Sequence, residues 1–236
     1  MAHAAFLLTD RLSQVVGSVG STADLSLLQP SAVRAACDIV EIRLDLLTPE
    51  ADASAPWQHL LETPLLFTAR RLDEGGGRAL NAAGRIRMLE PVLAQAACLD
   101  IEVASIDEMG ALLELLATRR IPWLASFHDF KHLPATATLE IAAQRALAAG
   151  ASAFKAAARL LQPADLARLA EFQLADHGLP VATMGMGPLA AVSRLLCAQC
   201  GSVLNYGHLG STATAPGQWD AALLKQTLAR LPLLRH

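Results

Sequence analysis

The sequence of 236 residues has no excess of positive charge and no long apolar segment. Its 19 basic and 22 acidic side chains leave a formal charge of −3, which excludes the positive field that attracts nucleic acid. The uncharged stretch 178–193 is interrupted by glycine and proline, and it falls short of the roughly 20 apolar residues of a membrane-spanning helix. The N-terminus lacks the basic start and the apolar run of a signal peptide. We therefore expect a globular, cytoplasmic protein that binds neither nucleic acid nor membrane.

Cysteine is sparse, with 4 residues in the chain. Cys37 and Cys98 are isolated beside apolar runs, which is typical of small buried residues. Cys197 and Cys200 form a single C-x-x-C, but no second pair and no histidine at ligand spacing accompany it. We interpret the surrounding segment as a helix and predict no metal site.

The chain also lacks a linker, a block of like charges and a low-complexity tract. Short apolar runs alternate with longer segments whose apolar residues recur every three or four positions, which indicates strands alternating with amphipathic helices. The expected strands are 14–21, 38–45, 64–70, 98–105, 122–130, 152–158, 179–187 and 202–207. The clearest expected helices are 84–97, 107–120, 136–150, 163–178, 188–200 and 218–231.

Eight β-α units in a chain of this length predict an α/β fold, a (β/α)8 TIM barrel that spans residues 1–236 as a single catalytic domain. A doubly wound sheet is the alternative. It usually carries a glycine-rich phosphate turn after its first strand, and the segment 17–20 has too few glycines at the wrong spacing.

Charged side chains gather at the ends of the expected strands, where a barrel has its catalytic groups. Glu41, Arg43 and Asp45 share one face of the second strand because alternate residues point the same way. The next four strands add Arg70, Asp100 with Glu102, His128 and Lys155.

Each of these groups also has an ordinary structural interpretation. Glu41 and Arg43 could form an ion pair, His128 could be a hydrogen-bonded core residue, and Lys155 could extend to the rim. Asp100 and Glu102 could support cations without touching a ligand. Charges in strands covered on both faces are costly unless paired or used, so their convergence favours a functional site.

Lysine and histidine together indicate carbonyl chemistry. Only a neutral amine attacks a carbonyl, and the apolar neighbours of Lys155 disfavour its charged form, although Asp100 and Glu102 would oppose this effect. A histidine such as His128 can transfer protons in both directions near neutral pH. We therefore expect Schiff-base chemistry on an anionic, hydroxylated carbonyl compound.

Eight short segments match one enzyme family in order and spacing. They are EIRLD (41–45), LLFTARRLDEGG (65–76), LDIE (99–102), SFHDF (126–130), AFK (153–155), TMGMG (183–187), VSR (192–194) and TAPGQ (214–218). The chain thus resembles the type I 3-dehydroquinate dehydratases of the shikimate pathway. This resemblance implies a (β/α)8-barrel lyase that converts the small molecule 3-dehydroquinate to 3-dehydroshikimate with no metal or organic cofactor.

The resemblance also implies residue roles. Lys155 resembles the lysine that forms a Schiff base with the C3 ketone of the substrate. His128 resembles the general acid–base, and Glu74 the carboxylate that orients this histidine. Arg194 resembles the arginine that grips the substrate carboxylate. The remaining predicted site residues comprise a set that binds the ring hydroxyls (Ser18, Glu41, Arg43 and Arg70) and two residues of a closing loop (Thr214 and Gln218).

Three features depart from the family pattern. Thr214 replaces the usual lid serine, residues 156–158 are alanines after the lysine, and Arg159 stands at a methionine position. Two other functions remain as alternatives: another lysine-dependent barrel enzyme, such as an aldolase, and a non-catalytic homologue that binds a shikimate-like metabolite. The high apolar content permits a homodimer formed through helix faces.

Overall fold

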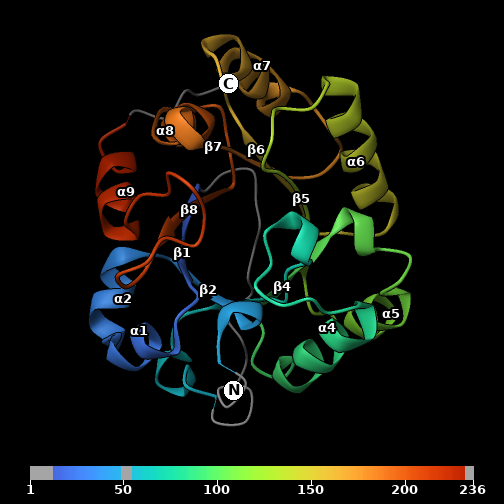
Figure 1. Ribbon diagram of the computed structural model, residues 1–236, viewed down its shortest axis with the longest axis vertical. Helices are drawn as coiled ribbons and strands as arrows, with labels where there is room; N and C mark the ends of the chain where they lie inside the picture. The colour runs from blue at the N-terminus through green and yellow to red at the C-terminus, as the bar shows by residue number, and fades with distance from the viewer. Residues whose placement is uncertain (1–12, 49–54, 232–236) are drawn as a thin grey trace.

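The computed structural model describes residues 13–48 and 55–231, which form a parallel β-barrel surrounded by helices (Figure 1). Neighbouring strands pair in the order β7-β6-β5-β4-β3-β2-β1-β8, and every pairing is parallel. The barrel closes between β7 and the start of β8, where the Val203 amide donates to the Val181 carbonyl at 3.1 Å. The strands are β1 (Gln14–Val19), β2 (Ile39–Arg43), β3 (Leu65–Thr68), β4 (Cys98–Glu102), β5 (Trp123–Asp129), β6 (Ala153–Arg159), β7 (Val181–Met186) and β8 (Leu204–His208).

The helices form the outer ring of Figure 1. They are α1 (Thr22–Leu27), α2 (Pro30–Ala36), α4 (Ala82–Leu89), α5 (Gly110–Arg119), α6 (Thr136–Ala148), α7 (Pro163–Leu174), α8 (Ala190–Gln199) and α9 (Ala221–Leu228). Their starts carry ordinary signals: the side chains of Ser21, Asn81 and Asp220 accept from backbone amides in the first turn. Proline occupies the first turn of α2 and α7, where its missing N–H costs nothing.

The predicted (β/α)8 barrel is confirmed, and each expected strand overlaps an observed one. The strand β4 ends three residues earlier than expected, because Val103–Ser105 turn into a 3-10 helix after Glu102. The C-x-x-C segment is helical as interpreted, since Cys197 lies in α8 and Cys200 caps its end. No helix among the described residues is long and apolar enough to cross a membrane. The signal-peptide interpretation concerns the N-terminus, whose residues 1–12 lie outside the described part of the chain.

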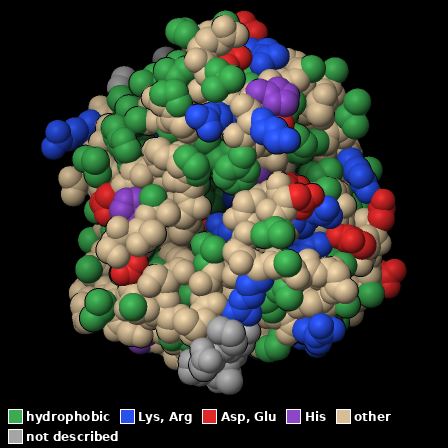
Figure 2. Space-filling view, in the orientation of Figure 1, with side chains coloured by type: hydrophobic (Ala, Val, Ile, Leu, Met, Phe, Trp, Pro, Cys, Tyr) green, Lys and Arg blue, Asp and Glu red, His purple; other side chains and the backbone are tan. Residues whose placement is uncertain are grey.

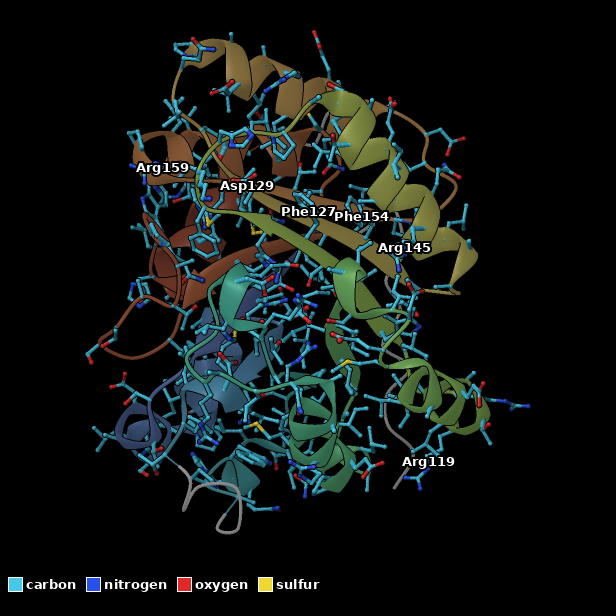
Figure 3. The ribbon with its side chains drawn as sticks, turned by 45° about the vertical axis from the view of Figure 1, so that its right-hand side comes forward. Arg119, Phe127, Asp129, Arg145, Phe154 and Arg159 are labelled. Carbon is cyan, nitrogen blue, oxygen red and sulfur yellow. The ribbon has the colours of Figure 1, made fainter. Side chains whose placement is uncertain are left out.

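Side chains that point away from the barrel axis pack against the helices. Phe154 of β6, for example, meets Phe172 of α7 edge to face with ring centroids 6.3 Å apart (Figure 3). The inward side chains form a second apolar cluster at the N-terminal end of the barrel, which comprises Val16, Ile39, Leu66, Cys98, Leu124, Ala153, Ala182 and Leu204 among others.

Two residues further along each strand, most of the inward side chains are polar. Six of them are now polar: Ser18, Glu41, Thr68, Asp100, Ser126 and Lys155. The other two are Met184 of β7 and Tyr206 of β8. Because alternate residues of a strand share a face, inward side chains two residues apart form two stacked layers. The lower layer is apolar, and the layer above it is buried and largely polar. The fold therefore places the polar layer directly beneath the C-terminal mouth of the barrel.

Candidate active site

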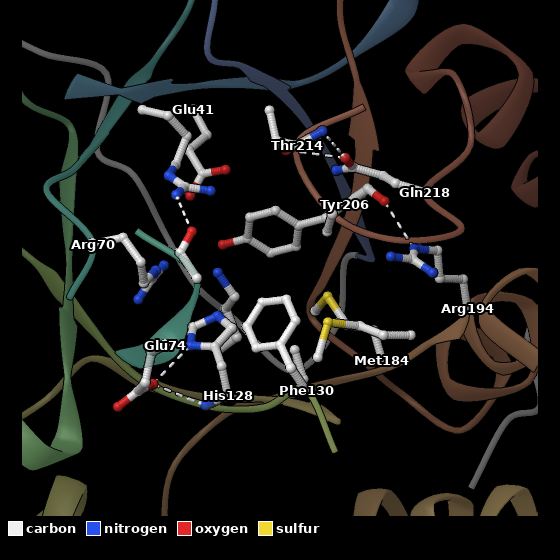
Figure 4. A pocket seen from close by; sticks show the side chains of 16 residues that line it. Glu41, Arg70, Glu74, His128, Phe130, Met184, Arg194, Tyr206, Thr214 and Gln218 are labelled. Atoms are coloured by element: carbon white, nitrogen blue, oxygen red, sulfur yellow. Dashed lines mark hydrogen bonds and ion pairs between the residues drawn. The ribbon is translucent and has the colours of Figure 1, made fainter. Parts of the chain in front are cut away.

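A cleft of about 480 Å³, its mouth included, opens above the polar layer. Figure 2 shows it as a hollow near the middle of the molecule, and Figure 4 shows its side chains. Nine of the ten predicted site residues line it, together with Tyr206, Phe130, Met184 and Met186 among others. The tenth, Ser18, lies behind this surface and contacts Glu41 and Thr214.

Lys155 projects from the middle of β6 and is only 4% exposed. Its Nζ lies 2.8 Å from Oδ2 of Asp100 and 4.1 Å from the centroid of the Tyr206 ring, over the ring face. An ion pair and a cation–π contact therefore hold the amine in one position. Asp100 therefore faces the lysine, as considered from the sequence, while Glu102 does not contact it.

Asp100 also fixes Arg70, which clarifies the role of this carboxylate. Both Nη atoms of Arg70 donate to Asp100 at 2.8 Å, and Nη1 also reaches Glu102 at 3.1 Å and Ser126 at 2.6 Å. The cations Arg70 and Lys155 outweigh burial and hold the pKa of Asp100 well below its usual value. Asp100 is thus a permanent anion that orients two cations.

Glu102 extends this network to a residue that the sequence interpretation missed. Arg85 of α4, 2% exposed, donates through Nη1 to Oε2 of Glu102 at 2.7 Å. Glu102 therefore joins Arg85 to Arg70 and does not reach the cleft surface. An arginine in a helix 15 residues after Arg70 gives no local sign of this contact, since only the fold brings them together.

His128 and Glu74 form a pair, as predicted. Nδ1 of His128 lies 2.9 Å from Oε2 of Glu74, and the His128 amide donates to the same oxygen at 2.9 Å. Glu74 ends a 3-10 turn (Leu72–Glu74) that closes at Gly75 with φ of +88°, a conformation that favours glycine. The two contacts to one oxygen orient the imidazole and leave its Nε2 free of protein partners among the described residues.

The electrostatics of this pair suit proton transfer. Burial, with help from the cations Arg70 and Lys155, holds the pKa of His128 well below its usual value. Burial raises the pKa of Glu74 to about 7, although Arg70 opposes this shift. The imidazole is therefore a neutral base near pH 7, beside a carboxyl group that titrates in the same range.

The pairing of Glu41 and Arg43 differs from the ion pair considered above. Arg43 donates through Nε and Nη2 to Asp45 at 3.0 and 2.8 Å, and not to Glu41. Glu41 instead accepts from the hydroxyl groups of Ser18 and, at 2.8 Å, Thr68. Alternation on one strand face placed these side chains correctly but could not decide which of them would meet.

Arg194 of α8 is buried without an acidic partner among the described residues. It is 1% exposed, and it donates to the carbonyls of Tyr206, Gly185 and Ala190 at 2.9–3.0 Å. Burial lowers its pKa to about 10, so the guanidinium stays charged at neutral pH. A buried cation held only by neutral carbonyls is a ready receptor for an anion.

The segment after β8 contributes Thr214 and Gln218 to the cleft and contacts Ser18 of β1. Oε1 of Gln218 accepts from the Thr214 amide at 2.9 Å and lies 3.0 Å from the Thr214 hydroxyl. That hydroxyl is also 2.9 Å from the Ser18 hydroxyl of β1. The threonine therefore keeps the hydroxyl that the resemblance expects from a serine at this position.

The features that depart from the family pattern lie mostly outside the cleft. Arg159 is exposed at the far end of β6 (Figure 3), and of the three alanines after Lys155 only Ala157 lines the cleft. The large cleft-lining side chains that the interpretation missed are Tyr206, Phe130, Met184 and Met186. The periodicity of β7 and β8 could have identified three of them, since they occupy the same inward positions as the charged residues.

Fold and site together define a (β/α)8-barrel enzyme with its active site at the C-terminal end of the strands. The family model for type I 3-dehydroquinase matches residues 16–233. The chain belongs to the type I 3-dehydroquinase family.

Individual relatives agree with this assignment. A 3-dehydroquinate dehydratase of Desulfotalea psychrophila is 34% identical over 203 residues, which cover 83% of this chain and 88% of the relative. One of Methanosarcina mazei is 31% identical over 212 residues, covering 85% and 88%. Among solved structures, the 3-dehydroquinate dehydratase of Geobacillus kaustophilus superposes with a TM-score of 0.81 at 24% identity, covering 93% of this chain and 91% of the other.

Proposed function

We propose that this chain dehydrates 3-dehydroquinate to 3-dehydroshikimate through a Schiff base on Lys155, with His128 as the general acid–base. The observation that carries the proposal is the convergence of Lys155, the His128–Glu74 pair and the unpaired Arg194 on one cleft. Membership of the type I 3-dehydroquinase family supports the same reaction.

Substrate binding follows from the free hydrogen-bonding capacity of the cleft. Arg194 is a charged group without an anion, so it would bind the substrate carboxylate and leave the ring pointing toward Lys155. Glu41 lines the opposite side and would accept from ring hydroxyls, with Ser18 behind it. Arg43 and Arg70 are already bound to Asp45 and Asp100, so they would supply their remaining N–H groups from fixed positions.

Imine formation comes first. The lysine first gives a proton to the neutral imidazole of His128, and the free amine attacks the C3 carbonyl carbon. The carbinolamine then loses its oxygen as water, with the proton that His128 returns. The resulting iminium ion withdraws electrons from C2. Asp100, which faces Nζ at 2.8 Å, would stabilise the positive charge at that nitrogen.

Elimination follows. Nε2 of His128 takes a proton from C2, and the C–H electrons move to the iminium to give an enamine. The enamine expels the C1 hydroxyl, which leaves as water with the proton that His128 returns. Glu74 stabilises the imidazolium between these two transfers. Water then hydrolyses the conjugated imine and regenerates the free lysine, so the net reaction is the loss of one water molecule.

We also propose a location, a domain organisation and a cofactor requirement for the enzyme. Near-balanced charge and the absence of a membrane-spanning helix among the described residues support a cytoplasmic location. We further propose that the whole chain acts as one catalytic domain without a resident metal or organic cofactor. A homodimer through the helix faces stays a prediction.

Two measurements test the proposed function. Incubation with 3-dehydroquinate should produce the ultraviolet absorbance of the enone product. Borohydride added with substrate should inactivate the enzyme and add one ligand mass to the peptide that contains Lys155. Lys131 and Lys225 serve as internal controls, because the former is outside the cleft and the latter pairs with Asp38. An adduct on either control, or retro-aldol cleavage of a sugar phosphate in place of dehydration, would refute the proposal, as would binding without turnover.

A further inference from the structure

Tyr206 is the only tyrosine of the chain, and its hydroxyl has no hydrogen-bond partner among the described residues. The residue is 3% exposed and lines the cleft from β8. Buried polar groups are almost always hydrogen-bonded, because leaving one unpaired costs free energy. A buried phenol without a partner, in the wall of an active site, therefore indicates a group that a ligand engages.

Two contacts hold Tyr206, one at its ring and one at its backbone. Nζ of Lys155 lies over the ring, 4.1 Å from its centroid, and Nε of Arg194 donates to the Tyr206 carbonyl at 3.0 Å. Figure 4 shows the phenol directed across the cleft toward Glu41 and Arg70, away from Arg194. The hydroxyl therefore lies between the arginine that would bind the carboxylate and the residues that would bind ring hydroxyls.

The phenol is a hydrogen-bond donor at any working pH. Burial, followed by the carboxylates of Glu41 and Asp100, holds its pKa well above the usual 10. Neither carboxylate accepts from the phenol in the structure: Glu41 accepts from Ser18 and Thr68, and Asp100 from Ser126, Arg70 and Lys155. The structure thus leaves the Tyr206 hydroxyl for a ligand oxygen.

We propose that Tyr206 donates a hydrogen bond to the substrate oxygen on the ring carbon next to the one that Lys155 attacks, which makes it a specificity residue for an α-hydroxy ketone. The inference rests on the proposed function. Nζ sits over the centre of the phenol ring and the hydroxyl at the edge of that ring. When Nζ bonds to the carbonyl carbon, the oxygen on the adjacent carbon is the one that comes within reach of this edge.

The test is Tyr206→Phe, which deletes only the oxygen. With 3-dehydroquinate, kcat/KM should fall about tenfold, the value of one neutral hydrogen bond. The melting temperature should not fall, because the hydroxyl has no hydrogen-bond partner to lose in the described part of the chain. Thr183→Val is the matched control, since the Thr183 hydroxyl donates to Gln173 at 2.8 Å outside the cleft. This control should lose stability and keep kcat/KM.

A second experiment distinguishes the loss of a contact between Tyr206 and the substrate from a change in the structure of the active site. The probe is a cyclic 3-oxo carboxylate that lacks the hydroxyl next to the ketone, and the readout is the rate of borohydride trapping on Lys155. Wild-type and Tyr206→Phe proteins should be trapped at equal rates with this probe. An unchanged kcat/KM for 3-dehydroquinate, or the same tenfold loss with the probe, would overturn the inference. Absence of turnover by the wild-type protein would remove the proposed function as well, which distinguishes the two failures.

Discussion

Replacing Arg194 by methionine should weaken substrate binding strongly and leave the stability of the free protein almost unchanged. The pKa of the guanidinium falls from 12.5 to about 10 on burial, and this shift corresponds to about 3 kcal/mol of unfavourable free energy in the folded state. The Arg194→Met substitution removes that cost. It also removes three hydrogen bonds to backbone carbonyls, at about 1 kcal/mol each. The two effects offset, so the melting temperature should stay within about 4 °C of the wild type.

The loss of substrate affinity in Arg194→Met, unlike the change in stability, is not offset by a second contribution. A guanidinium can make two charge-assisted hydrogen bonds to a carboxylate, each worth about 1.5–3 kcal/mol. Loss of both should raise KM for 3-dehydroquinate by roughly 100-fold or more. Initial rates from the enone absorbance give KM, and thermal unfolding with and without product gives an independent measure of binding. Product should raise the melting temperature of the wild type and not that of the variant.

The conservative variant Arg194→Lys separates charge from geometry. Lysine keeps a positive charge but cannot form the planar two-pronged contact, so its KM should lie between those of the wild type and Arg194→Met. Both variants need circular dichroism spectra like that of the wild type. A KM within about threefold of the wild-type value for a folded Arg194→Met protein would refute the assignment of Arg194 as the carboxylate receptor.

Two further predictions concern the histidine pair. His128→Ala should lower kcat by at least about 100-fold while the fold survives, because the side chain faces the cleft; near-normal turnover by the folded variant would remove His128 from the mechanism. The pKa of Glu74 near 7 predicts an acid limb of kcat/KM near pH 7, and Glu74→Gln should move this limb to lower pH; an unmoved limb would assign it to another group. The folded-state pKa of Glu74 lies above its ordinary value of 4.5, so its contribution to stability decreases as the pH rises from about 4.5 to 7. The free energy of unfolding of Glu74→Gln, taken relative to that of the wild type, should therefore be higher at pH 8 than at pH 5. Urea unfolding at the two pH values measures this difference, and the opposite trend would contradict the burial argument.

The eight strands and the layer of polar residues were predictable from local sequence patterns. Both follow from local periodicity: apolar residues at three- and four-residue steps bury one helix face, and alternate strand residues share one side of the sheet. The same alternation brought Glu41 and Arg43 to the inner face. Matching motifs added Glu74, Arg194 and the Thr214–Gln218 segment, none of which periodicity would have singled out, because all of them lie outside the strands.

The contacts between these groups and their charge states depend on the three-dimensional fold. Arg43 pairs with Asp45 and not with Glu41 where β2 ends in a 3-10 turn. Asp100 lies between Arg70 and Lys155 because the barrel brings inward side chains of non-adjacent strands together. Among the described residues, Arg194 has no acidic partner and the Tyr206 hydroxyl has no hydrogen bond, because burial removes water and the surrounding fold supplies no substitute. Charge state depends on those distances and on that burial, which are properties of the folded chain and not of its local sequence.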